Sequence, residues 1–335
     1  MLAILGATGY TGRLVIEEAR RAGVSLRLVG RRREALEELA GPGEEVRVAD
    51  GQDGDALREA LSGAFAVVST AGPFLEIGYA PVEAAIDVGA HYLDITGEQE
   101  FIRHVHEELS VPAAGAGVVL LSAFGMDYVP GDFAARLAAY GLEEPLDEIS
   151  VGYFIQATPS RGTMKTAALI GGRPHVVWVE DRLVESKRGA PSKTFAFPFG
   201  DQECLEWGGA EPVTVPRHTR VREVRSYWRI PEGAISQEAV ADMAAAEAPG
   251  TGPSQDERAN SRVAVMAVAR RGSESRTVTL TGRDPYGLTA LLIVRGYEAL
   301  RAGEARGTGA LAPAEAFDVH AFLPRLAPLL VRVQS

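Results

Sequence analysis

The chain begins with a short apolar run that leads directly into a glycine-rich turn. Residues 1–5 are apolar, and in residues 6–12 every third position is Gly. Apolar side chains then recur at the spacing of one helix face, at Leu14, Val15, Ala19 and Ala22. Continuous apolar runs indicate buried strands, whereas a period near 3.6 indicates a helix. This pattern predicts a strand, a turn and a helix in immediate succession.

The same alternation of apolar runs and helical periodicity continues through the first third of the chain. We expect strands at residues 1–5, 25–29, 45–49, 64–70, 91–95 and 117–121, with helices between them. The run at 64–70 is apolar at almost every position, which is typical of a parallel strand covered on both faces. Strands and helices in this order predict a doubly wound Rossmann domain of residues 1–125.

Farther along the chain the pattern changes to alternation with a period of two. In residues 148–157 the apolar positions of one face are Ile149, Val151, Tyr153 and Ile155. Further strands are expected at 175–184, 262–269 and 275–282, the last two as an antiparallel hairpin around a glycine-containing loop. Helices are expected at 163–170, at 288–302 and within 313–330. The sequence therefore predicts an α/β protein whose second domain, residues 126–285, is α+β with a mixed or antiparallel sheet.

The composition argues against several classes of protein. The 335 residues carry a formal net charge of −11, which argues against a nucleic-acid surface built from clustered Lys and Arg. Cys204 is the only cysteine, so no intrachain disulfide can form, and this usage fits a reducing cytoplasm. No apolar run reaches the ~18 residues of a membrane span, and the chain enters its first strand without a basic leader. We therefore expect a cytoplasmic protein without a membrane span.

The glycine-rich turn is a candidate phosphate site. A helix N-terminus presents unpaired N–H groups and positive dipole density, and Gly lets a pyrophosphate approach the backbone closely. The residues expected to contact a dinucleotide here are Gly6, Thr8, Gly9, Tyr10, Thr11 and Gly12. The alternative is a purely structural turn, but the strand before it and the helix after it favour a binding site.

The residues that follow the second predicted strand indicate which dinucleotide to expect. An acidic side chain there would accept a hydrogen bond from the ribose 2′-hydroxyl, whereas a cation would pair with a 2′-phosphate. The chain has Arg31 and Arg32 at this point and no carboxylate before Glu34. Because guanidinium groups match phosphate geometry, the sequence predicts NADP(H), with Arg31 as the first contact and Arg32 as the second. The alternative is that these arginines only solvate the start of the next helix.

Three further strand ends are expected to line the same crevice. The residues expected there after the fourth and fifth strands are Ala71, Gly72, Pro73, Thr96 and Gly97. Small residues at the first of these strand ends would let the backbone pass beneath the cofactor. Asp50 follows the third strand and is expected near the adenine, or else to cap the next helix.

Several segments of the chain carry motifs that occur together in one known family. These segments are residues 6–12, 30–31, 71–74, 91–98, 125–132, 282–290 and 309–317. Together they resemble the saccharopine dehydrogenase (reductase)-like superfamily, including its trans-acting enoyl reductase-like oxidoreductases. The resemblance implies NADP(H) in the first domain, a substrate domain whose sheet helps form the active-site floor, and a C-terminal helical segment, 286–335, that returns to the first domain. It also implies hydride transfer to an imine or enoyl double bond of a small metabolite.

The two kinds of acceptor place different demands on the protein. An iminium ion accepts hydride without prior protonation, whereas an enoyl group needs a stabilised enolate and then a proton. The candidate catalytic residues near the crevice are Asp127, Tyr128 and Lys165, and the candidate substrate-binding residues are Glu98 and Tyr153. Asp127 could instead cap a helix, Tyr128 could pack between domains, and Glu98 could bind the loop backbone.

Two classes of function remain open. The first is an NADPH-dependent reductase that acts on a small-molecule substrate. The second is a non-catalytic NADPH-binding sensor or scaffold, which an open nicotinamide pocket without an enclosed cavity would favour. The six histidines show no spacing typical of a metal site, so no metal is expected. The oligomeric state is also open, with a homodimer as one candidate.

Overall fold

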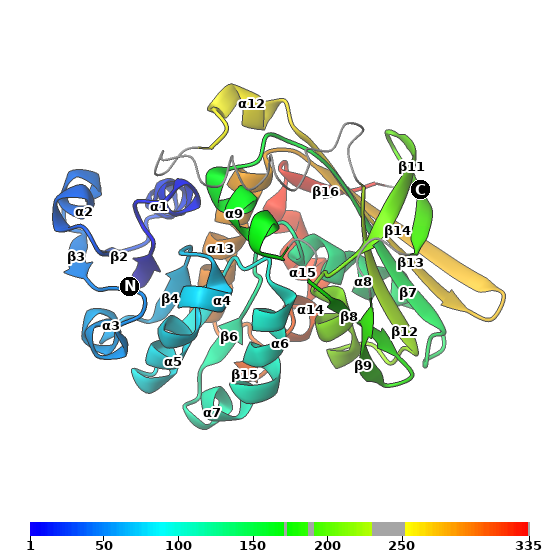
Figure 1. Cartoon of the computed structure of the whole chain (residues 1–335), viewed down its shortest axis with the longest axis horizontal. Coiled ribbons are helices and arrows are strands. Elements are labelled where there is room, and N and C mark those ends of the chain that lie inside the picture. Colours follow the sequence, from blue (N-terminus) through cyan, green and yellow to red (C-terminus); the bar gives the residue numbers. More distant parts are fainter. Residues whose placement is uncertain (171–172, 187–190, 230–251, 334–335) are drawn as a thin grey trace.

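The structure is a computed structural model that describes residues 1–170, 173–186, 191–229 and 252–333. Two β-sheets lie next to each other along the long axis of the molecule, and helices pack around them (Figure 1). The first sheet is parallel and the second is mixed. The predicted fold class, a Rossmann domain followed by a domain with a mixed sheet, is therefore confirmed.

The first sheet forms the Rossmann half of the molecule. Within the described residues it has seven strands in the order β15-β6-β5-β4-β1-β2-β3, all parallel. These strands are β1 Leu2–Leu5, β2 Leu26–Gly30, β3 Glu45–Val48, β4 Ala66–Ser69, β5 His91–Asp94, β6 Val119–Leu121 and β15 Gly309–Ala310. Because the strand order reverses between β1 and β4, a ligand crevice is expected outside the carboxyl ends of these two strands.

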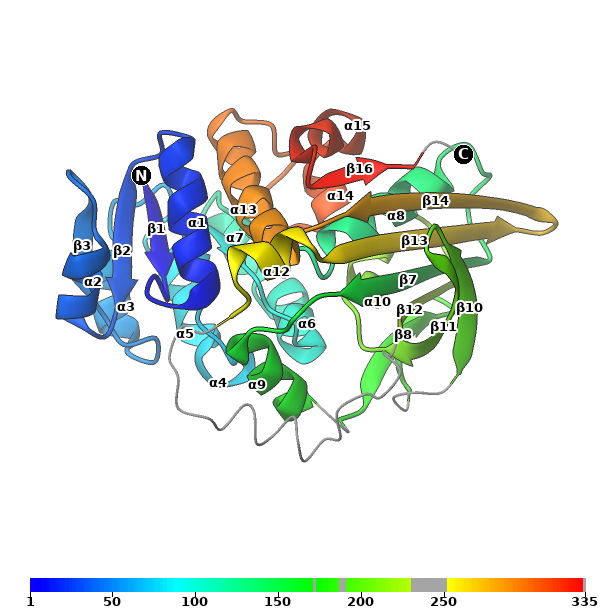
Figure 2. The ribbon, with the colours of Figure 1, turned by 90° about the horizontal axis from the view of Figure 1, so that it is seen from above.

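Helices cover both faces of this sheet. They are α1 Tyr10–Arg21, α2 Arg33–Leu39, α3 Gly54–Leu61, α4 Phe74–Ile77, α5 Tyr79–Asp87, α6 Gln99–Glu108, α7 Ser110–Gly115 and α13 Pro285–Arg301. Leu2 and Ile4 of β1 pack into one apolar core with α1 and α13, whereas Ala3 and Leu5 pack into a second core with α3, α5 and α6. Figure 2 shows α1 and α13 side by side. Burial on both faces explains why the central strands are apolar throughout.

The second sheet is long and follows a different connectivity. Its main path in the described part of the chain is β10-β11-β12-β7-β13-β14-β16, with β8 paired to β12 and β9 paired to β8. The strands are β7 Glu148–Gln156, β8 His175–Val179, β9 Arg182–Ser186, β10 Ser192–Phe197, β11 Gly200–Trp207, β12 Glu223–Arg229, β13 Arg262–Arg271, β14 Glu274–Gly282 and β16 Leu330–Arg332. The pair β7–β12 is parallel, and β13 and β14 form the predicted hairpin.

One helix joins the two halves through a shared core. α8, Val129–Ala139, buries Val129 and Phe133 in the same apolar cluster that holds Leu2 of the first sheet and Val265 of the second. The remaining helices are α9 Arg161–Ile170, α10 Glu211–Thr214, α12 Gln255–Ala259, α14 Pro313–Ala316 and α15 Val319–Phe322. None of the helices in the described ranges is long and apolar enough to cross a membrane.

Two predicted elements differ from the structure. The single strand expected at 175–184 is wrong, because the chain reverses at Glu180 and Asp181, which have φ of 48° and 60°, to form the hairpin β8–β9. Two successive residues with positive φ are the geometry of a tight hairpin turn. The helix expected within 313–330 is instead the two short helices α14 and α15, and β16 closes the segment.

Candidate active site

The glycine-rich turn joins β1 to α1 in a tight loop. Gly6 has φ of +81°, and a Cβ at Gly12 would overlap the carbonyl oxygen of Gly6. Helix α1 starts after Gly9 without a side-chain cap. No hydrogen bond within the described residues engages the N–H groups of Tyr10, Thr11 or Gly12. These free N–H groups at a helix N-terminus fit a dinucleotide pyrophosphate.

The side chain of Tyr10 links this turn to the second half of the chain. Its hydroxyl donates to the carbonyl oxygen of Pro253 at 2.5 Å, and its ring packs edge-on against Tyr286 at 5.1 Å between centroids. Burial raises the pKa of Tyr10 to about 12. The carbonyl of Thr8 accepts a hydrogen bond from Arg13 at 3.2 Å. The backbone of the turn, and not the Tyr10 hydroxyl, is thus the part left available to a phosphate.

The end of β2 presents two unpaired guanidinium groups. Arg31 and Arg32 follow β2 directly, are exposed, and have no ion pair with any described residue. Arg33 instead pairs with Glu37 at 3.4 Å. Beyond β3, the carboxylate of Asp50 is exposed and accepts from the Gln52 N–H at 3.0 Å.

The next helix, α3, is capped by a different carboxylate. Asp53 accepts a hydrogen bond from the Ala56 N–H, so the capping role considered for Asp50 belongs to Asp53. The exposed side chain of Asp50 therefore stays near the carboxyl end of the sheet.

The loops after β4 and β5 are joined by one buried carboxylate. Glu98 is fully buried and accepts from the backbone N–H groups of Phe74 at 2.8 Å and Leu75 at 2.6 Å. Burial raises the pKa of Glu98, and a hydrogen bond from Thr166 of α9 acts in the opposite direction. The backbone contact considered for Glu98 is therefore present. It holds the segment that contains Ala71, Gly72 and Pro73.

The glycine turn lies against the same loop. A Cβ at Gly6 would lie 2.9 Å from the Ala71 backbone nitrogen, so the turn after β1 and the loop after β4 are adjacent. On the other side, Thr96 accepts from the Glu98 N–H at 3.1 Å. The predicted cofactor residues of β1, β4 and β5 are therefore brought together at one edge of the sheet.

A second buried carboxylate ties β5 to β6. Asp94 accepts from the N–H groups of Thr96 at 3.0 Å and Ala123 at 2.8 Å, and from the Ser122 hydroxyl at 2.9 Å. Burial raises the pKa of Asp94 to about 6. These bonds fix the segment from which the candidate residues Asp127 and Tyr128 follow.

The three candidate catalytic residues differ in burial and in their contacts. The Tyr128 hydroxyl donates to the carbonyl of Gly97 at 3.1 Å, and the side chain is buried. Asp127 is half-buried, its carboxylate has no hydrogen bond with any described residue, and burial raises its pKa to about 6. Lys165 lies on the exposed side of α9. Tyr128 therefore contacts Gly97 at the crevice, whereas Lys165 faces solvent.

Tyr153 is a fully buried residue of β7. Its hydroxyl donates to Glu211, and its ring stacks on Trp228 with 5.4 Å between centroids. Burial raises the pKa of Glu211 to about 7 and that of Tyr153 well above its usual value. This contact uses the hydroxyl that a substrate would need.

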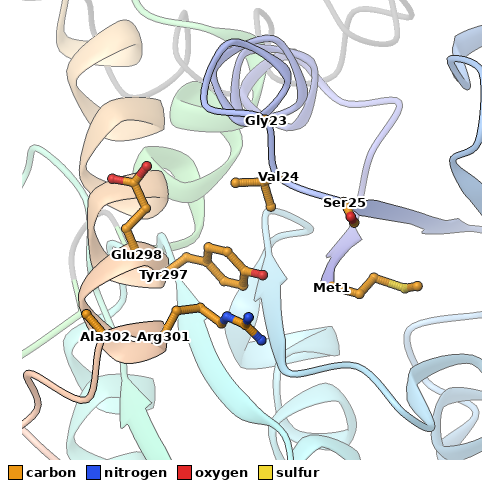
Figure 3. A pocket seen from close by; sticks show the side chains of 8 residues that line it. All are labelled: Met1, Gly23, Val24, Ser25, Tyr297, Glu298, Arg301 and Ala302. Carbon is orange, nitrogen blue, oxygen red and sulfur yellow. The ribbon is translucent and has the colours of Figure 1, made fainter.

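Beside these loops lies a cavity of about 210 Å³ between the two halves of the chain. It is bordered by Leu75, Gly97, Glu98, Arg103, Arg173 and His175. A larger hollow of about 460 Å³ lies at the opposite end of the sheet, between the start of β1 and α13, where Met1, Val24, Tyr297 and Arg301 surround it (Figure 3). Because ligands of doubly wound folds bind at the carboxyl ends of the strands, the smaller cavity is the candidate acceptor site.

Sequence reasoning missed two residues at this cavity. Gln99, the first residue of α6, clamps β8: its side chain accepts from the Val176 N–H at 2.7 Å and donates to the Val176 carbonyl at 2.9 Å and the Gly209 carbonyl at 2.7 Å. His175 begins β8 and borders the cavity. The only signal in the sequence was that Gln99 directly follows the family motif at 91–98.

Comparisons with known proteins agree with this arrangement. Residues 6–138 match a family model described as NAD(P)H-binding. A lipid droplet localized protein of Caenorhabditis elegans is 29% identical over 187 residues, which are 50% of this chain and 44% of that protein. A trans-acting enoyl reductase of Mycobacterium leprae is 32% identical over 139 residues, 39% of this chain and 33% of that protein. A saccharopine dehydrogenase-like oxidoreductase of Mus musculus is 29% identical over 151 residues, 39% and 35% of the two chains.

The sequence matches are partial, whereas the structural match is complete. The chain spans less than half the length of these curated relatives. Saccharopine dehydrogenase (L-Glu forming) from Saccharomyces cerevisiae, in its apo form, superposes with a TM-score of 0.63 over 99% of both chains at 13% identity, which shows a common fold. The resemblance to the saccharopine dehydrogenase-like proteins is thus confirmed, in fold along the whole chain and in sequence over its NAD(P)H-binding part.

Proposed function

We propose that this protein is an NADPH-dependent reductase that transfers hydride to an activated C=N or C=C bond of a small metabolite. The observation that carries the proposal is that the cofactor turn and the cavity share one edge of the first sheet. The free N–H groups of α1 lie at this edge, and the cavity is bordered there by Gly97 and Glu98. A concave space at the same sheet edge as a dinucleotide turn favours catalysis over a non-catalytic sensor or scaffold.

The proposed cofactor is NADP(H), and the proposed selectivity rests on charge. Arg31 and Arg32 are exposed, unpaired within the described residues, and directly follow β2. The bound dinucleotide would supply the hydride. The protein would hold it through the turn at 6–12 and the loops at 71–73 and 96–97.

The chain's own residues have separate proposed tasks. Burial raises the pKa of Asp127 to about 6, so its carboxyl group exchanges a proton in the weakly acidic range and is mostly ionised at pH 7. Tyr128 fixes the Gly97 carbonyl at the border of the cavity. Glu98 orders the loop beneath the cofactor. Lys165 and Tyr153 stay candidates for contact with the acceptor.

The proposal also covers the roles of the domains, the location of the protein in the cell and its oligomeric state. Residues 1–125 would bind the cofactor, 126–285 would shape the acceptor site, and 286–335 would join the two, as the pairing of β15 with β6 supports. A cytoplasmic location is proposed from the single buried thiol of Cys204. A homodimer stays a candidate.

Two measurements test the function. Fluorescence titration with NADPH and NADH should give binding of both, with NADPH clearly tighter. NADPH oxidation should then be screened against cyclic imines, pairs of amino acid and ketone, and enoyl thioesters. Absence of NADPH binding would remove the function, whereas tight binding without turnover of any acceptor class would favour a sensor or scaffold.

A further inference from the structure

His175 has an unusual environment for a buried histidine. Its side chain is 3% exposed, and its Nε2 lies 3.1 Å from Oε1 of Glu206. Its other ring nitrogen, Nδ1, is buried and has no hydrogen bond with any described residue. Buried polar atoms are nearly always paired, so an unpaired one calls for a functional or structural reason.

Glu206 fixes the tautomer of this imidazole. Burial acts to raise the pKa of Glu206, but hydrogen bonds from His175, Ser186 and Arg225 outweigh it, and the pKa lies below its usual value. The Ser186 hydroxyl donates to Oε1 at 2.5 Å, and Arg225 donates to Oε2. An ionised carboxylate can only accept, so the Nε2 of His175 carries the hydrogen. The Nδ1 position is then left to exchange a proton with another partner.

The position of His175 is set by the Gln99 clamp. Gln99 binds both backbone polar groups of Val176, the residue after His175, and it directly follows Glu98 in the crevice. His175 consequently borders the cavity together with Gly97 and Glu98 at the carboxyl edge of the first sheet. A base oriented by a carboxylate, beside a cavity, is the arrangement of a general acid–base residue.

A second buried histidine shows why the unpaired atom alone would not suffice. In His106 both ring nitrogens are buried and have no hydrogen bond with a described residue, and burial lowers the pKa of this side chain to about 3. His106 borders neither of the two cavities described above. It is therefore a neutral core residue, whereas His175 has a carboxylate partner and is one of the residues that border the cavity.

We propose that His175 is a further catalytic residue of this site and that it gives a proton from Nδ1 to the acceptor as hydride arrives; this rests on the proposed reductase function. The hydride brings two electrons and forms the new C–H bond. The π-electron pair of the C=N or C=C bond moves to the second atom, which takes the proton of Nδ1. The electron pair of the broken Nδ1–H bond stays on the ring, which is left neutral, and water then supplies a new proton.

Charged groups from each neighbouring element will enter the pH dependence of this step. Glu206 comes from β11, and Arg225 from β12 is itself paired with Glu223. The other charged side chains that border the cavity are Glu98, Glu100, Arg103, Arg173 and Glu185. The experiments below therefore compare variants at matched pH.

The first experiment measures access to Nδ1 without any acceptor. The folded protein is treated with diethyl pyrocarbonate, which modifies unprotonated imidazole, and each histidine is followed by mass spectrometry. His320 is exposed and His106 is buried, so they set the fast and slow limits. We expect His175 to react at least about ten-fold faster than His106, because the cavity needs less opening than the core. Equal rates for His175 and His106 would overturn the proposal.

The second experiment uses the acceptor found by screening. His175→Gln keeps a donor for Glu206 but cannot deliver a proton, so turnover should fall roughly 10²–10⁴-fold with unchanged NADPH affinity. The limb of the pH profile that requires a protonated group should also disappear. His320→Gln is the matched control and should leave all three unchanged. Unchanged turnover in His175→Gln would refute only the catalytic role of His175. If the wild-type protein did not bind NADPH, the proposed reductase function itself would be refuted.

Discussion

Replacing Gln99 by Ala should weaken the joint between the two halves of the molecule. The side chain makes three hydrogen bonds, at 2.7, 2.9 and 2.7 Å, and is 9% exposed. Each is worth roughly 0.5–1.5 kcal/mol net, and the backbone groups left behind are buried, so the free energy of unfolding should fall by about 3 kcal/mol. Glu100→Ala is the matched control. The Glu100 side chain is exposed, and its one ion pair, with Arg173 at 3.5 Å, lies at the surface. Its removal should therefore lower the free energy of unfolding by less than about 1 kcal/mol.

Urea denaturation followed by two signals measures this effect. All three tryptophans lie on the second sheet, at residues 178, 207 and 228, so their fluorescence reports that half, whereas circular dichroism reports the whole chain. In the Gln99→Ala variant the fluorescence transition should move to lower urea and separate from the dichroism transition. A loss of less than about 1 kcal/mol, with coincident transitions, would refute the view that Gln99 couples the two halves.

Three further predictions concern the cofactor turn and the crevice. Arg31→Asp should weaken NADPH binding about 10- to 100-fold by fluorescence titration, because a charge-assisted bond to phosphate is lost, and leave NADH nearly unchanged; the same loss in the ion-paired Arg33→Asp would contradict this assignment. Gly12→Ala should abolish binding of either dinucleotide, because the added Cβ would overlap the Gly6 carbonyl and distort the turn. Unchanged affinity in a folded variant would show that the turn is not the dinucleotide site. Burial raises the pKa of Asp127 to about 6, so its ionisation destabilises the folded state increasingly as the pH rises above the unfolded pKa of ~3.9, and the full cost is reached above about 6. Asp127→Asn should therefore raise the free energy of unfolding by up to about 3 kcal/mol at pH 8 and hardly at pH 4, and an equal gain at both would show that burial of charge is not the cause.

The sequence predicts this fold well where local signals and long-range pairing agree. The central strands β1 and β4 are almost wholly apolar, and helical periodicity separates the first six strands along the chain, so these six were recognisable on their own. The two-residue strand β15 was not. The reversal at Glu180 and Asp181 was not, because neither residue is the Gly or Asn that marks such turns. The strands β10 to β12 also escaped prediction, since they alternate between buried and exposed positions in a sheet that is formed by distant pairing.

The sequence predicted the parts of the site that are formed by the backbone, but not the contacts between side chains. The glycine turn and the loop residues could be placed because a parallel sheet gathers its carboxyl ends at one edge. The side-chain contacts could not, because they join residues far apart in the chain. Gln99 binds a residue 77 positions later, and His175 pairs with Glu206 across 31 positions. Glu98 shows the intermediate case, since its motif was recognised but its bond to the loop backbone was only one of two alternatives.

The pairing of β15 with β6 has a consequence for how the chain can be synthesised and divided. Gly309 donates to the Val118 carbonyl at 2.8 Å, and Leu311 donates to the Leu120 carbonyl at 3.0 Å. During translation β6 is synthesised almost two hundred residues before β15. Until β15 emerges, β6 is therefore an unpaired edge strand of the Rossmann sheet. Unpaired strand borders recruit other chains. A fragment that ends after β6 would therefore be prone to aggregation. We expect the Rossmann half to need β15 from the end of the chain in order to fold as a stable unit.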